Sequence, residues 1–240
     1  LAARGDLRTL EDLVTYSINR HYPLLKNETN LALALLNAVI EQQIKLIVHW
    51  MRVGFVHGVM NTDNMTISGE TIDYGPCAFM DQYDERTCFS SIDLQGRYSF
   101  GNQPRIAQWN LARFAETLIP LINRDEKMSI KIAEESINSF KKIYEQKWFE
   151  MMKSKLGIFD EEEKDLLLIQ NLLKWMETHQ ADYTNTFCCL MNQKIGNLEI
   201  YEDTNFINWK SEWEDRLKRS ERSQDEIINM MRSVNPIIIP

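Results

Sequence analysis

Apolar residues recur at every third or fourth position along most of this chain. In the clearest case they run down one face in the series Leu33, Leu36, Ile40, Ile44, Ile47 and Met51. A period of about 3.6 residues is typical of an amphipathic helix, so this stretch predicts a helix with one buried face. Asn27–Asn30 offers N-cap residues for this helix, and Gly54 is well placed to end it.

The same spacing predicts helices over most of the remaining sequence. A first helix is expected over Asp6–Arg20. Later helices are expected at Ile106–Leu118, 130–151, 166–176, Asp182–Gln193 and Phe206–Arg232. Pro120 is expected to kink or end the first of these later helices, because proline lacks an amide donor. The acidic run Asp160–Glu163 suits a helix N-terminus and needs no functional explanation.

One stretch, residues 55 to 79, breaks the helical pattern. Within it, Met65–Ser68 and Thr71–Ile72 are β-prone, and Gly69-Glu70 between them suits a turn. Two short strands around a glycine-containing turn predict a β-hairpin. Residues 80 to 104 follow as an ordered loop. The expected fold class is therefore mainly α with a short β-hairpin island.

The hairpin would bring two oxygen-bearing side chains together. Asn64 stands at its start and Asp73 at its end, within the segment HGVMNTDNMTISGETIDYG of residues 57 to 75. Paired strands lie about 5 Å apart, so the two residues would face one point. Hard oxygen ligands suit Mg²⁺, which takes one or two protein groups and completes its shell with phosphate and water. The segment therefore predicts the metal half of a nucleotide phosphate site.

The composition narrows the classes of protein. The 240 residues are 44% hydrophobic and 26% charged, as in an ordinary globular chain. A net charge of −8 argues against a general nucleic-acid binder, which needs a basic surface. No uninterrupted apolar run approaches the ~20 residues of a membrane span. The chain starts at Leu1 without a Met or a signal-peptide pattern, so we expect a piece from the middle of a longer protein.

The cysteines give no sign of a metal site or a disulfide framework. They are Cys77, Cys88, Cys188 and Cys189, and no two of them have CxxC spacing. A zinc site and a thioredoxin-like motif are therefore disfavoured. We expect reduced thiols in an intracellular compartment.

The order of the motifs matches the C-lobe of a protein kinase. A long helix is followed by His57-Gly58, then by Asn64, then by the triplet Asp73-Tyr74-Gly75. In kinases the catalytic loop, with a His at its start and an Asn at its end, precedes Asp-Phe-Gly. Val59 occupies the position of the catalytic Asp, and a valine cannot accept a proton. A conventional kinase is therefore only the third-ranked interpretation.

The amino-acid sequences of these motifs are more specific than their order. HGVMNTDNM followed by TIDYGP resembles the selenoprotein O (SelO) family of pseudokinases. Other segments resemble the family in its order: LAARGDL at 1–7, INRHYP at 18–23, GRYSFGNQP at 96–104 and WNLARFAETLIPL at 109–121. The resemblance implies a kinase-like C-lobe core with the metal and nucleotide site at 1–122, and a helical continuation of the same domain at 123–240. It also implies that the N-lobe is missing.

The resemblance implies a function as well. Family members transfer AMP from ATP, bound flipped relative to a kinase, to Ser, Thr or Tyr hydroxyls of proteins, with Mg²⁺ or alternatively Mn²⁺. On matching positions, Asp63 is the implied catalytic proton acceptor and Asn64 a metal ligand. Asp73 is implied to bind both the metal and the nucleotide. The fragment alone would be inactive. The family implies a mitochondrial protein if eukaryotic and a cytoplasmic one if bacterial.

Other interpretations stay open beside this one. The main rival is a non-catalytic pseudokinase scaffold that binds partners, which Val59 and the missing N-lobe favour. An isolated Asp63-Asn64 pair is more typical of an Asx-type turn than of a metal site. His57 is expected to brace the loop rather than to act as an acid or base, and Cys77 is expected to be a packed thiol.

Overall fold

A computed structural model describes residues 1–191 and 199–238. It confirms a mainly helical fold that contains one small two-stranded antiparallel sheet. The chain divides into two compact units that alternate along the sequence. The first unit comprises Leu1–Ile47, Val59–Tyr74 and Gln103–Glu145. The second comprises Val48–Gly58, Gly75–Asn102 and the described residues from Gln146 onward. The expected division at residue 122 stays a prediction.

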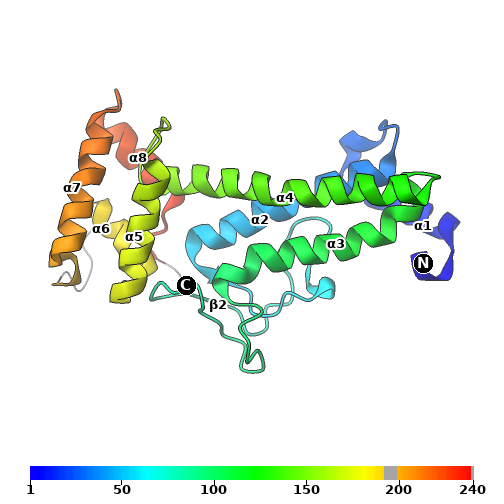
Figure 1. The fold of residues 1–240 in the computed structure, drawn as a ribbon, viewed down its shortest axis with the longest axis horizontal. Coiled ribbons are helices and arrows are strands. Elements are labelled where there is room, and N and C mark those ends of the chain that lie inside the picture. Colours follow the sequence, from blue (N-terminus) through cyan, green and yellow to red (C-terminus); the bar gives the residue numbers. More distant parts are fainter. Residues whose placement is uncertain (192–198, 239–240) are drawn as a thin grey trace. The chain divides into compact units, whose positions relative to one another are not determined.

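The first unit consists of helices and the segment 59–74, which is drawn in cyan in Figure 1. Its helices are α1 (Leu7–His21), α3 (Gln103–Ile122) and the larger parts of α2 (Leu31–Val53) and α4 (Glu126–Lys155). The apolar stripe of α2 is buried as expected, and Leu36, Ile44 and Ile47 are each 0% exposed. Short 3₁₀ helices lie at Ala2–Arg4, Pro23–Leu25 and Thr62–Asn64 in this unit, and at Phe100–Asn102 and Glu199–Glu202 in the second unit.

Side-chain caps fix where α1 and α2 begin, as their sequences predict. Asp6 accepts a hydrogen bond from the backbone N–H of Thr9 at 3.2 Å. Asn30 accepts one from the N–H of Leu33 at 3.0 Å, and its amide nitrogen donates to the carbonyl of Ile122 at 2.6 Å. Such bonds satisfy amide and carbonyl groups that have no partner within the helix. Asn30 thereby joins the start of α2 to the end of α3.

The structure excludes one of the two expected effects of Pro120, because α3 does not end at this residue, whereas the expected kink stays a prediction. Helix α3 continues through this proline to Ile122. Proline removes one amide donor, but here it lies only two residues before the helix ends. The carbonyl of Ile119 accepts a hydrogen bond from Ser129, and that of Ile122 accepts one from Asn30. Side chains therefore satisfy carbonyls of this last turn that the helix itself leaves unpaired.

The second unit contains the sheet and four short helices. Strand β1 (Phe55–Val56) pairs antiparallel with β2 (Ala78–Phe79), with Phe55 opposite Phe79. The helices are α5 (Asp165–His179), α6 (Tyr183–Leu190), α7 (Thr204–Lys218) and α8 (Gln224–Val234). Helices α5 and α7 lie side by side (Figure 1), and the indole N–H of Trp209 on α7 donates to the carbonyl of Leu168 on α5 at 2.8 Å.

The structure tests two helix predictions in this unit. The single helix expected over Phe206–Arg232 was wrong, because α7 ends at Lys218 and α8 begins at Gln224. Ser223 and Glu226 form a capping box, in which each side chain bonds the backbone N–H of the other, and this starts a new helix. The helix expected over Asp182–Gln193 is α6, capped by Asp182. The last two residues of that predicted helix, and residues 239 and 240 of the apolar chain end, lie outside the described residues.

Helix α2 alone, within the described part of the chain, is long and apolar enough to cross a membrane by length and composition. Half of its most apolar window is buried inside the protein. A core helix of a globular protein passes the same test, so the observation is weak support for a membrane span.

Candidate functional site: the loop between His57 and Asp73

The segment that carries the candidate site starts from a tightly packed His-Gly pair in the second unit. The His57 side chain is buried, and its ring centroid lies 5.4 Å from that of Trp50 and 6.4 Å from that of Phe55. Gly58 has a φ of +84°, and a Cβ at this position would lie 2.6 Å from the carbonyl oxygen of Pro76. Only glycine tolerates both conditions. The packing of His57 fits the structural role expected for it.

The expected hairpin is smaller than the sequence predicted. Met65 and Thr71 form an isolated antiparallel bridge in place of two strands. The turn closes by side-chain bonds, since the Thr66 hydroxyl donates to the carbonyl of Glu70 and accepts from its N–H, each at 2.9 Å. Gly69 has a φ of +74°, and a Cβ there would lie 2.8 Å from the Cβ of Gln42. The segment thus packs against α2 at its turn, and the ladder ends where Thr62–Asn64 forms a 3₁₀ helix and Asp73 adopts a left-handed backbone conformation.

The bridge still sets the register of the three predicted site residues, all of which lie in the first unit. With Met65 opposite Thr71, the next positions outward are Asn64 and Ile72, and then Asp63 and Asp73. Asp63 and Asn64 belong to the 3₁₀ helix Thr62–Asn64. Neighbouring antiparallel positions lie about 4.5–5.5 Å apart between Cα atoms where pairing continues. This register sets Asn64 opposite Ile72 and Asp63 opposite Asp73, and the bridge is an isolated one, so the convergence of Asn64 and Asp73 on one point stays a prediction.

The Asn64 side chain is oriented by its neighbour Val59. Its amide nitrogen donates to the backbone carbonyl of Val59 at 3.0 Å. An amide group bears its nitrogen and oxygen on opposite sides, so this bond turns the Oδ1 atom away from the carbonyl. The oxygen is the atom that a hard cation would need. The departure from the kinase motif, Val59, therefore contributes through its backbone.

Asp73 and Asp63 present exposed carboxylates. Asp73 has a φ of +56°, in the left-handed region, which a non-glycine residue rarely adopts. Such strained positions cluster at functional sites. Asp63 is exposed on the 3₁₀ helix and can be reached by a second macromolecule. Both groups are thus available to a ligand.

The donor set fits Mg²⁺ or Mn²⁺ better than zinc. Within residues 1–191 and 199–238, no group of three or more His, Cys, Asp and Glu side chains is arranged to hold a metal. One amide oxygen and one carboxylate are enough for Mg²⁺, which keeps several waters and binds phosphate. All four cysteines, which are among the described residues, are free thiols as expected.

Three residues that support this loop were missed at the sequence level. Asn110 on α3 donates to the carbonyl of Met60 at 2.9 Å, and Gln43 on α2 donates to that of Thr66 at 2.6 Å. The Tyr22 hydroxyl donates to the carbonyl of Ile67, and burial raises the pKa of Tyr22 to about 12. The available signal was a polar residue on a buried helix face, as Gln43 and Asn110 are.

The loop that follows, at residues 80 to 104, is ordered by its own acidic residues. Asp93 accepts hydrogen bonds from the backbone N–H groups of Arg97 and Tyr98, at 2.9 and 2.7 Å. Partial burial acts to raise the pKa of Asp93, but these bonds lower it overall. Asp84 forms an ion pair with Arg86. Both carboxylates are engaged within the loop.

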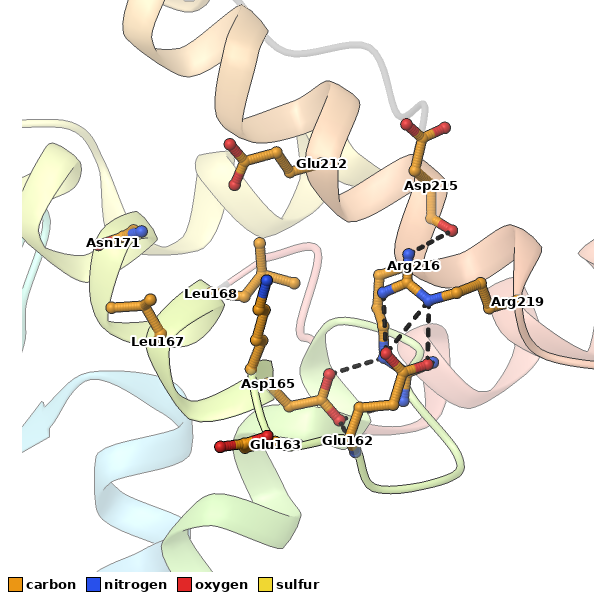
Figure 2. A pocket seen from close by; sticks show the side chains of 11 residues that line it. Glu162, Glu163, Asp165, Leu167, Leu168, Asn171, Glu212, Asp215, Arg216 and Arg219 are labelled. Atoms are coloured by element: carbon orange, nitrogen blue, oxygen red, sulfur yellow. Dashed lines mark hydrogen bonds and ion pairs between the residues drawn. The ribbon is translucent and has the colours of Figure 1, made fainter.

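A second candidate region is a pocket of about 780 Å³ in the second unit (Figure 2). Charged residues that line it form ion pairs with one another, so their presence is explained by the packing of the helices. Arg216 lies 2.6 Å from Asp165, and the two side chains are 4% and 1% exposed. Glu162 lies 3.2 Å from Arg216 and 2.9 Å from Arg219, and the hydrogen bond from Arg219 lowers the pKa of Glu162. The acidic run before α5 therefore anchors the end of α7, a role that its sequence did not indicate.

The chain is similar to curated proteins that are named as nucleotidyltransferases. "Protein nucleotidyltransferase YdiU" of Pelagibacter ubique (strain HTCC1062) is 53% identical over 240 residues, which are 100% of this chain and 50% of that protein. The protein of the same name from Bacillus cereus (strain ZK / E33L) is 54% identical over 239 residues, or 100% and 49%. The chain spans about half the length of the curated relatives it matches.

The particular family follows from a second comparison. The family model described as "Protein adenylyltransferase SelO" matches residues 1–240. The chain belongs to the SelO family of protein adenylyltransferases. This confirms the resemblance carried by the loop motifs.

Proposed function

We propose that this chain provides the catalytic loop of a Mg²⁺-dependent protein adenylyltransferase with a kinase-like C-lobe. The reaction would transfer AMP from ATP to Ser, Thr or Tyr hydroxyls of other proteins. Membership of the SelO family supports the general class. The observation that supports the assignment to these residues is their place on one small loop, which the Met65–Thr71 bridge closes and on which Asp63 and Asp73 are exposed.

Asn64 and Asp73 would hold the metal. The bond from Asn64 to the Val59 carbonyl leaves the amide oxygen for the cation, and Asp73 adds an exposed carboxylate. When bound, the metal would neutralise charge on the phosphates of ATP. Mn²⁺ prefers the same oxygen ligands and is the alternative ion. Asp73 would in addition contact the nucleotide.

Asp63 would accept the proton of the target hydroxyl. That oxygen attacks the α-phosphorus of ATP, a new P–O bond forms, and the bond to pyrophosphate breaks as pyrophosphate leaves. An exposed carboxylate is accessible to a protein substrate, and general-base catalysis of this kind contributes about 10²–10⁴-fold. Val59 cannot take the proton, which disfavours γ-phosphoryl transfer by the usual kinase base.

A labelling experiment on the full-length protein tests the proposal. ATP labelled at the α- or the γ-phosphate is supplied with Mg²⁺ and a mixture of protein substrates. We expect protein-bound label from α-labelled ATP alone, and none without Mg²⁺. Label from γ-labelled ATP alone would instead indicate a kinase in which another residue is the base, since Val59 cannot accept a proton. No label from either would favour the non-catalytic scaffold.

Two further expectations belong to the whole protein. An N-lobe would be needed to hold ATP, so residues 1–240 alone are expected to be inactive in the same assay. The compartment expected from the family is mitochondrial in a eukaryote and cytoplasmic in a bacterium.

A further inference from the structure

Helix α3 bonds both ends of the segment that carries two of the proposed site residues, and it does so through one side chain. The amide nitrogen of Asn110 donates to the backbone carbonyl of Met60 at 2.9 Å and also to the Sδ atom of Met65. An amide NH₂ group has two hydrogens, so one side chain can serve both acceptors. Asp63 and Asn64 lie between these two methionines. Asn110 therefore bridges the segment from end to end, within the first unit.

The carbonyl that Asn110 bonds is next to the one that orients the proposed metal ligand. The Asn64 side chain donates to the carbonyl of Val59 at 3.0 Å, and its backbone N–H donates to the carbonyl of Asn61 at 3.0 Å. The carbonyl between these two, that of Met60, accepts from Asn110. Because peptide groups are planar and are joined at shared Cα atoms, displacing the Met60 carbonyl would displace both neighbours. Asn110 thus acts on the peptide groups that hold Asn64.

The direction of the Asn110 amide is set by its surroundings. The residue is 5% exposed, so its side chain lies within the protein. A carbonyl oxygen can only accept, so the nitrogen of the amide is the atom that must face Met60. The exchanged orientation would set two oxygen atoms against each other.

Close packing does not surround this segment on every side. A pocket of about 330 Å³ borders it within the first unit, and its lining includes Gln43, Thr62, Met65 and Asn110. Side chains that border a pocket have fewer packing partners on that side. The position of the segment therefore depends more on the hydrogen bonds that it receives from the helices.

We propose that Asn110 is a positioning residue for adenylyl transfer and acts through the backbone of the segment that it bridges. It would hold Asp63 and Asn64 in the places, relative to Asp73, that the metal and the target hydroxyl require. The inference rests on the proposed function and adds to it a residue that contacts neither the metal nor a substrate. Contacts that orient a metal ligand from outside typically change metal affinity or activity by about 10–100-fold.

A matched pair of substitutions on α3 tests this role in the full-length protein. Asn110→Leu nearly keeps the size of the side chain and removes the donor. Gln108→Leu removes a bond of the same kind, because the Gln108 amide donates to the backbone carbonyl of Ile137 on α4 at 3.1 Å. The initial rate of transfer from α-labelled ATP is measured across a Mg²⁺ titration, and urea unfolding reports the stability of each variant.

We expect Asn110→Leu to lower kcat by about 10–100-fold and to raise the Mg²⁺ concentration that gives the half-maximal rate, whereas Gln108→Leu should change neither. A smaller folded fraction lowers the rate but leaves that Mg²⁺ concentration unchanged, so the titration separates positioning from general stability. Asn110→Asp is the second variant, should Asn110→Leu not fold. Its carboxyl group can donate only when protonated, so its rate relative to wild type should rise as the pH is lowered.

A wild-type rate and Mg²⁺ requirement in Asn110→Leu would overturn the positioning role, as would changes equal to those of Gln108→Leu or a pH-independent rate ratio for Asn110→Asp. Transfer by the wild type would leave the proposed function standing in each of these cases. If the wild type itself transfers no AMP, the proposed function fails, and calorimetry of Mg²⁺-dependent ATP binding replaces the rate. Unchanged affinity in Asn110→Leu, or no binding by the wild type, would then overturn the positioning role as well.

Discussion

The side-chain amide of Asn64 donates a hydrogen bond to the backbone carbonyl of Val59, 3.0 Å away. Val59 stands where a kinase has its catalytic Asp, yet its role here is to orient the proposed metal ligand. Because the contact uses the backbone, the identity of the side chain at position 59 is of secondary importance. The residue at position 64 has no such freedom, since both ends of its amide are used in the proposed site.

This hydrogen bond predicts that alanine at position 64 impairs AMP transfer, whereas alanine at position 59 does not. Asn64→Ala removes a proposed metal ligand, so AMP transfer should fall by at least about tenfold and require a higher Mg²⁺ concentration. Val59→Ala keeps the carbonyl and should leave the rate and the Mg²⁺ requirement nearly unchanged. The measurement is the initial rate of transfer from α-labelled ATP across a Mg²⁺ titration. Equal loss in both variants would show that Asn64 is not a specific ligand.

Asp73 is expected to be essential for transfer but dispensable for the fold. Asp73→Ala should abolish AMP transfer in the full-length protein, because it removes the carboxylate proposed to bind both metal and nucleotide. Its left-handed backbone, with a φ of +56°, costs alanine about 1 kcal/mol. The measurements are label transfer and the midpoint of thermal unfolding. Retained transfer by Asp73→Ala would remove Asp73 from the mechanism.

Two further variants at this position separate charge from backbone strain. Asp73→Asn keeps a side chain that tolerates the left-handed region, and Asp73→Gly relieves the strain altogether. Both should unfold at or above the wild-type temperature while remaining inactive. Activity of Asp73→Gly would show that AMP transfer depends on the backbone conformation at this position and not on the carboxylate.

Local signals in the sequence were enough to predict most helices. Asp6 and Gly54 mark a start and an end that the structure confirms, because caps and left-handed glycines act within a few residues. A single helix was wrongly predicted over Phe206–Arg232 because the apolar spacing was given more weight than the capping box formed by Ser223 and Glu226. Pro120 does not end α3, and the sequence around it did not indicate this, because the side chains that bond the last carbonyls, Asn30 and Ser129, lie outside this helix.

The contacts that support the candidate loop could not be predicted from the sequence. The motif placed Asn64 and Asp73 on either side of a turn, and the structure has the Met65–Thr71 bridge between them, whereas their role as ligands stays a prediction. The bonds from Gln43 and Asn110 to the loop span 23 and 50 residues of sequence. Contacts at that separation depend on how helices pack, which periodicity does not specify. The pocket that these two residues line could not be predicted for the same reason.

The Arg216–Asp165 pair is expected to be important for stability. Both side chains are almost fully buried, and Asp165→Ala would leave the Arg216 guanidinium without this partner. Removing one member of a buried pair costs about 3–5 kcal/mol. Urea unfolding monitored by circular dichroism measures the change. As a control, Glu145→Ala breaks the exposed pair with Lys141 and should cost less than about 0.5 kcal/mol. Similar costs for the two variants would contradict this prediction.

Lys155, the last residue of α4, is an unusual cation for a protein interior. It is 1% exposed, and its Nζ atom donates to the carbonyl of Arg52 at 2.8 Å. The same atom lies 3.9 Å from the ring centroid of Phe187 and 4.9 Å from that of Tyr183. These rings favour the charged form, but burial, assisted by the nearby Arg52, lowers the pKa of Lys155 well below its usual value.

The lowered pKa predicts that Lys155 makes the free energy of unfolding increase with pH. In the unfolded chain a lysine titrates near pH 10.4, about its ordinary value. Between the folded and unfolded pKa values the unfolded chain binds more protons, so raising the pH stabilises the folded state. Urea unfolding across the range from neutral to about pH 10 should therefore show wild type gaining stability relative to Lys155→Met. Lys218→Met is the control, because Asp215 raises the pKa of Lys218 and its difference from wild type should not grow. Parallel curves for wild type and Lys155→Met would show that Lys155 stays charged in the folded protein.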